Sequence, residues 1–238
     1  MPLDPPSVVL VHGAWADGSS WSKIIPPLAA KGLPTVAAPL PLTSLQADVA
    51  ALEQTLERIT GAGPIIVAGH AYAGAVISCI RNERVGALVY IAALAPDEGE
   101  TVADVFYRTP PHPEAPRLAP DAHGLIYLPE AAFAAAFAQN ASTAELAVLA
   151  AAQRPISPAC ITVPVPRPLW KDRPAWYLVA EDDRMITAEN QGFMAGRMHA
   201  RAHSHAADHA PMITAPSLVL EVLGEAVTAI RSLAARGS

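Results

Sequence analysis

The sequence predicts an α/β protein with a mostly parallel sheet, helices on both faces and one inserted segment. First, short apolar runs rich in β-branched residues alternate with amphipathic helical patterns, which is typical of strands joined by crossover helices. Second, the apolar run 64–68 leads through the glycine-flanked turn 69–74 into a helical pattern. Third, thirteen of the 24 prolines lie between Pro96 and Pro174, so the alternation stops there and resumes afterwards.

The first part of the chain shows two strand–helix pairs. Buried strands are expected over 7–11 and 35–38, because both runs are short, apolar and closed by glycine or proline. Ser19 or Ser20 is expected to begin the helix between them, and Gly32 to end it. A second helix is expected from Ser44 to Ile59, with apolar residues spaced by three and four.

The pattern continues on both sides of the proline-rich stretch. Before it, we expect a strand over 64–68, a helix that includes 76–80 and a strand over 87–92. After it, the expected elements are a strand over 176–180, a helix over 188–198, a weak strand over 201–206 and a final helix over 216–231. Residues 1–95 and 175–238 therefore form the predicted core.

Residues 96–174 form the predicted insertion. Helical patterns over 130–139 and 143–152 alternate there with proline-rich turns. Because the strand–helix pattern resumes afterwards, we interpret this segment as a lid (cap) subdomain and not as an independent domain.

Composition narrows the possible partners and compartment. The net charge of −6, without a run of Lys or Arg, argues against nucleic acid and anionic membrane surfaces. No apolar run is long enough for a transmembrane helix, and the first residues do not resemble a signal peptide. Cys79 and Cys160 form no metal or redox motif, no histidine pair has metal-ligand spacing, and no cofactor is expected. These features favour a cytoplasmic protein.

The turn 69–74 has the form of a nucleophile elbow, in which a strained turn between strand and helix exposes a serine hydroxyl. Here the central residue is Ala71, which has no nucleophilic atom. Either a nucleophilic serine was replaced, which would leave an inactive variant, or the chain is a natural non-catalytic relative.

Three further turns follow predicted strands and therefore lie at the same edge of a parallel sheet. The turn at Ala14 offers backbone N–H groups that, with that of Tyr72, would form an oxyanion hole. Asp183 is the candidate triad acid, with Asp182 as the alternative, and His209 is the candidate base. Their order along the chain is nucleophile, acid, histidine.

These motifs resemble the α/β-hydrolase superfamily. The resemblance rests on residues 9–15, 69–74 and 183–186 and on the pair 208–209, and it spans nearly the whole chain. It is strongest with the small esterases, which include plant methyl-ester esterases, hydroxynitrile lyases and bacterial carboxylesterases. It implies a Ser-His-Asp carboxylesterase in which Ala71 stands at the nucleophile position.

Two other activities of this fold remain as alternatives. Hydroxynitrile lyases of the group carry threonine and lysine where this chain has Gly13 and Ala210, so the esterase branch is favoured. Cofactor-free dioxygenases use a His–Asp pair without a serine.

The expected substrate is a small, apolar or aromatic ester, and the sequence does not predict the oligomeric state. The candidates to contact that ester are aromatic or sulfur-containing side chains near the expected turns and in the insertion: Trp15, Tyr72, Phe106, Trp170 and Met185.

Overall fold

The computed structural model describes residues 4–236, with side chains described to residue 233, and contains one six-stranded sheet. All neighbouring strands are parallel, in the order β2-β1-β3-β4-β5-β6. The strands are β1 (Ser7–Val11), β2 (Thr35–Ala38), β3 (Ile65–His70), β4 (Val85–Ile91), β5 (Ala175–Ala180) and β6 (Arg201–His205). The predicted fold class is confirmed.

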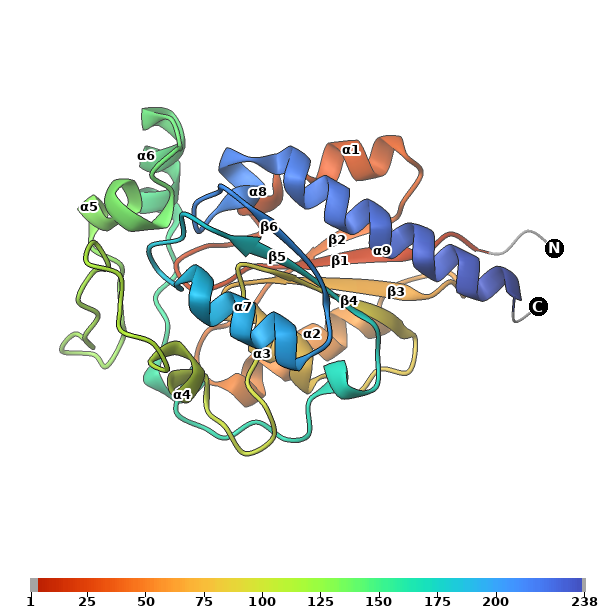
Figure 1. Ribbon diagram of the computed structural model, residues 1–238, viewed down its shortest axis with the longest axis horizontal. Helices are drawn as coiled ribbons and strands as arrows, with labels where there is room; N and C mark the ends of the chain where they lie inside the picture. The colour runs from red at the N-terminus through yellow and green to blue at the C-terminus, as the bar shows by residue number, and fades with distance from the viewer. Residues whose placement is uncertain (1–3, 237–238) are drawn as a thin grey trace.

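Helices cover both faces of this sheet (Figure 1). On one face lie α1 (Ile25–Ala30), α8 (Pro211–Thr214) and α9 (Pro216–Arg236). On the other lie α2 (Leu45–Glu57), α3 (Ala73–Cys79) and α7 (Ala188–Arg197). Strands β1, β3 and β5 are buried along their whole length, as their continuous apolar runs predict.

The insertion lies between β4 and β5 in the chain. Its part from α4 to α6 lies near the carboxyl ends of the strands (Figure 1). It contains α4 (Val102–Phe106), α5 (Glu130–Ala132), the π-helix η2 (Phe133–Phe137), α6 (Thr143–Ala152) and the 3₁₀ turns η3 (Pro158–Cys160) and η4 (Leu169–Lys171). The helix predicted over 130–139 is thus divided, because η2 follows α5 with wider i→i+5 hydrogen bonding.

Two other helix predictions need correction. The expected first helix is a 3₁₀ turn, η1 (Gly18–Trp21), followed by α1, and its N-cap is Asp17, whose side chain accepts from the backbone of Ser19. Helix α2 ends at Glu57, two residues before the predicted end. Its predicted start is confirmed, because Ser44 caps it by accepting a hydrogen bond from Ala47.

Within the described residues, no helix combines the length and apolar character needed to cross a membrane.

Candidate active site

The turn after β3 keeps the conformation of a nucleophile elbow. Ala71 has φ = +50°, in the left-handed region that costs an L-residue other than glycine about 1–2 kcal/mol. Its N–H donates to the carbonyl of Ile91 (3.2 Å), and its own carbonyl accepts from Gly74 (3.1 Å) and Leu94 (2.9 Å). These three hydrogen bonds hold the strained turn although no serine is present.

Glycine is required around this turn because the backbones approach too closely for a side chain. A Cβ at position 74 would lie 2.4 Å from the carbonyl oxygen of Leu94, and one at position 69 would lie 2.9 Å from the backbone of Ala73. These two glycines therefore allow helix α3 to lie close to β3 and to the chain after β4.

The acid turn after β5 and the histidine turn after β6 meet beside the elbow. Nδ1 of His209 lies 2.8 Å from Oδ2 of Asp183, and both side chains are at most 2% exposed. Asp183 also accepts from the backbone N–H groups of Met185 (2.7 Å) and Ile186 (2.9 Å) and from the amide of Gln191 (2.8 Å). All three of these groups donate to the Asp183 carboxylate. The carboxylate accepts from Nδ1–H of His209 as well, so Nε2 of His209 is left for a substrate.

Asp182, the alternative acid, is exposed. Its backbone N–H donates to Ala207 and its carbonyl accepts from Gln139. The geometry favours Asp183.

Two aromatic rings fix the position of the His209 imidazole. The ring of His70 lies 4.7 Å away and that of Phe137 lies 5.1 Å away, nearly edge-on. Nε2 of His70 donates to the carbonyl of His209 (2.7 Å). Burial, and then the nearby His209, hold the pKa of His70 well below its usual value, so His70 is a neutral structural donor.

The candidate oxyanion donors face the same space. Within residues 4–236, the backbone N–H groups of Ala14 and Tyr72 donate to no protein acceptor. The turn at Ala14 is packed against the elbow, since a Cβ on Gly13 would lie 2.9 Å from the carbonyl oxygen of His70 and 3.0 Å from Cβ of Ala71. Two free N–H groups beside the nucleophile position are what stabilisation of a developing oxyanion requires.

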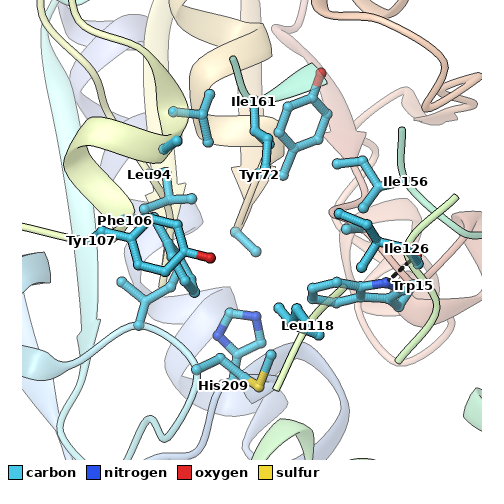
Figure 2. A pocket seen from close by; sticks show the side chains of 16 residues that line it. Trp15, Tyr72, Leu94, Phe106, Tyr107, Leu118, Ile126, Ile156, Ile161 and His209 are labelled. Atoms are coloured by element: carbon cyan, nitrogen blue, oxygen red, sulfur yellow. Dashed lines mark hydrogen bonds between the residues drawn. The ribbon is translucent and has the colours of Figure 1, made fainter. Parts of the chain in front are cut away.

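An apolar pocket opens above these groups (Figure 2). Its empty space measures about 700 Å³ when it is counted out to the open mouth, with solvent included. The predicted site residues that line it are Ala14, Trp15, Ala71, Tyr72, Phe106, Met185 and His209.

Trp170, which is predicted to contact the substrate, is not among the residues that line this pocket. It lies in η4, where its indole N–H approaches the carbonyl of Pro96 at 3.4 Å and the ammonium of Lys171 lies 5.5 Å from the ring. The proline-rich chain leads this tryptophan away from the strand ends, against α3.

Several residues that support the site could not be identified from the sequence. Asp48, fully buried in α2, accepts from the Tyr72 hydroxyl (2.7 Å) and the Leu42 N–H (2.6 Å). Burial raises the pKa of Asp48, and the bonds from Tyr72 and Leu42 oppose that rise. The only sequence signal is an aspartate on the apolar face of an amphipathic helix. Phe137 and Tyr107, both in the insertion, give no signal.

No group of three or more described His, Cys, Asp or Glu side chains is arranged to hold a metal ion. Among the described residues that line the pocket, the titratable side chains are His209 and two tyrosines.

Comparisons with known proteins agree with this architecture. Among solved structures, the chain is similar to polyneuridine aldehyde esterase (TM-score 0.80, 17% identity, 93% of this chain and 99% of that one). It is also similar to a pyrethroid hydrolase from Sphingobium faniae (TM-score 0.78, 19% identity, 95% of this chain and 98% of that one). A third similar structure is a tomato methylketone synthase I variant complexed with beta-ketoheptanoate (TM-score 0.80, 16% identity, 96% of this chain and 100% of that one). At these identities the likeness shows the fold alone.

A comparison with curated protein sequences finds no match. The sequence profile of the Alpha/beta hydrolase family, however, matches residues 8–222, which include all of the sheet except Ser7 and all four turns of the site. This chain therefore belongs to the α/β-hydrolase family.

Proposed function

We propose that this protein is a carboxylic-ester hydrolase of the serine type in which Ala71 occupies the nucleophile position. One observation carries the proposal: His209, which is paired with the buried Asp183, and Ala71 border the same apolar pocket. The substrate would be a small ester with an apolar or aromatic acyl or alcohol group, because the described residues of the wall include no Lys, Arg, Asp or Glu.

With serine at position 71, the remaining groups would complete the reaction. Nε2 of His209 would take the hydroxyl proton as the serine oxygen attacks the ester carbonyl. The oxyanion would accept from the N–H groups of Ala14 and Tyr72. The carbon–oxygen bond to the alcohol would then break, the alcohol would leave with the proton from His209, and water would hydrolyse the acyl-enzyme. With Ala71, the pocket binds the ester but forms no acyl-enzyme.

Restoring the hydroxyl tests the proposal. Ala71→Ser should create hydrolysis of small aryl or alkyl esters, since loss of such a nucleophile costs roughly 10⁶ in kcat. Acid release at pH 7.5 measures the activity, and Ala71→Ser combined with His209→Gln is the matched control that should stay inactive. If Ala71→Ser folds with an unchanged melting temperature and hydrolyses none of the esters, the proposal fails.

A second candidate function is decarboxylation of a β-keto acid, a reaction that needs no nucleophilic atom at position 71. The methylketone synthase with a similar fold is described with a β-keto acid bound. Loss of carbon dioxide from such an acid breaks the bond between the carboxylate carbon and its neighbour, and leaves an enolate. The N–H groups of Ala14 and Tyr72 would stabilise the enolate oxygen, and protonated His209 would return a proton to carbon.

The unmodified protein distinguishes the two candidates. Decarboxylation predicts that it converts 3-oxoheptanoate to 2-hexanone and carbon dioxide, that His209→Gln abolishes this, and that Ala71→Ser does not increase it. Headspace gas chromatography measures the ketone. A rate equal to that of the uncatalysed reaction contradicts this second function and leaves the ester proposal standing.

A further inference from the structure

The pocket wall offers a substrate very few polar contacts. Two of its polar side-chain atoms are already used by the protein: the indole N–H of Trp15 donates to Ile126 (2.9 Å), and the hydroxyl of Tyr72 donates to Asp48 (2.7 Å). Figure 2 shows the Tyr72 hydroxyl directed away from the pocket. The ring of His209 and the hydroxyl of Tyr107 are the remaining side-chain groups.

Tyr107 differs from Tyr72 in where its hydroxyl lies. Figure 2 shows this hydroxyl directed into the pocket, on the side of the cavity that faces Trp15 and above His209. Within residues 4–236 the hydroxyl has no hydrogen-bond partner, and the residue is 60% exposed. A tyrosine whose hydroxyl stabilises the fold would be paired and buried, so its polar atom is available to a ligand.

The backbone beneath Tyr107 is firmly held. Helix α4, which ends just before it, begins with a capping box between Thr101 and Asp104. The buried amide of Asn190, in α7, donates to the carbonyl of Val105. The ring of Tyr107 packs edge-on against Phe106, with centroids 4.9 Å apart. The backbone that carries Tyr107 is therefore held in place beside the pocket.

We propose that Tyr107 determines substrate specificity by donating a hydrogen bond to a second, uncharged oxygen acceptor near the reacting carbonyl. This inference rests on the proposed function, because it places the reacting carbonyl at the N–H groups of Ala14 and Tyr72. The preferred substrate class is then an apolar ester with a keto or similar oxygen close to the ester group. A negatively charged acceptor is disfavoured, since no Lys or Arg lines the pocket.

Binding of two matched esters to the unmodified protein tests the inference. Ethyl hexanoate and ethyl 3-oxohexanoate differ by one keto oxygen, and Ala71 allows equilibrium binding to be measured by titration calorimetry. The unmodified protein should bind the keto ester about tenfold more tightly, on the scale of one hydrogen bond. Tyr107→Phe removes only the hydroxyl and should bring the ratio of the two affinities to about one.

Tyr127→Phe is the matched control, because Tyr127 is also an exposed tyrosine of the insertion (48%) and does not line the pocket. It should leave both affinities unchanged. Equal affinities for the two esters, or a preference that persists in Tyr107→Phe, would overturn the role of Tyr107 and leave the proposed function standing. Failure of the unmodified protein to bind either ester would contradict both the proposed function and this inference.

Discussion

His70 precedes the nucleophile position and joins the elbow to the histidine turn. Its imidazole is 1% exposed and donates to the carbonyl of His209, so it holds the backbone of the candidate base. Burial keeps its pKa well below the usual 6.5. His12, which lies under the oxyanion turn, has a pKa lowered mainly by burial as well. Both residues therefore resist protonation in the folded state.

This resistance predicts acid destabilisation. Below pH 6.5 the unfolded chain binds a proton on His70 that the folded protein does not, so the free energy of unfolding falls as pH falls. His70→Gln keeps an amide donor for His209 but cannot titrate. From pH 7.5 to 5.5 the unmodified protein should lose about 1 kcal/mol more than this variant. Urea denaturation measures the free energy of unfolding of both proteins at the two pH values. An equal loss of stability in the two proteins would show that His70 is protonated in the folded protein.

At the scale of elements, the site depends on how closely α3 approaches β3 and the chain after β4. Gly74 forms that contact, and a Cβ there would meet the Leu94 carbonyl and, at 2.8 Å, Cβ of Ala93. The backbone of the buried Leu94 cannot move aside at low cost. The glycine therefore serves packing, whether or not position 71 is reactive.

Gly74→Ala should lower the free energy of unfolding by about 1–3 kcal/mol, the usual cost of overpacking. Gly224 is the matched control: it lies inside α9, and an added Cβ would have no neighbour within 4 Å. Gly224→Ala should raise stability by about 0.5–1 kcal/mol, because alanine favours the helix. Chemical denaturation compares the two. Stabilisation by both substitutions would disprove the close contact at Gly74.

At the scale of the whole molecule, residues 133–140 of the insertion rest directly on the two turns that carry the His–Asp pair. The guanidinium of Arg184 donates to the carbonyl of Ala135 (2.7 Å), and the amide of Gln139 donates to the carbonyl of Asp182 (2.7 Å). The N–H of Asn140 donates to Asp208 (3.0 Å). These contacts couple the position of the insertion to that of His209, on which Phe137 packs.

Weakening one of these contacts should loosen this segment without unfolding the core. Arg184→Met should increase hydrogen exchange of the amides of 133–140 by about tenfold, with a change of less than about 1 kcal/mol in global stability. Arg173 offers a control, because it also donates to a backbone carbonyl, that of Val85, at the opposite end of the strands. Arg173→Met should leave exchange in 133–140 unchanged; an effect equal to that of Arg184→Met would argue against direct docking.

Local patterns of residues predict the parallel sheet and the four turns that meet at one edge of it. Each depends on local signals: β-branched runs form buried strands, glycine permits the close turns at Gly13 and Gly74, and Asp183 and His209 directly follow strands. In a parallel sheet all such turns lie at the same edge, so their proximity follows from the order of elements alone.

The side chains that surround these turns depend on tertiary packing. The insertion lacks the alternating pattern that would position its side chains, so Trp170 was expected in the pocket and lies outside it. Tyr107 and Phe137 reach the site through contacts between residues far apart in sequence. Asp48 meets Tyr72 only because α2 packs against α3. Such contacts depend on how separate elements pack, and no local pattern of residues encodes them.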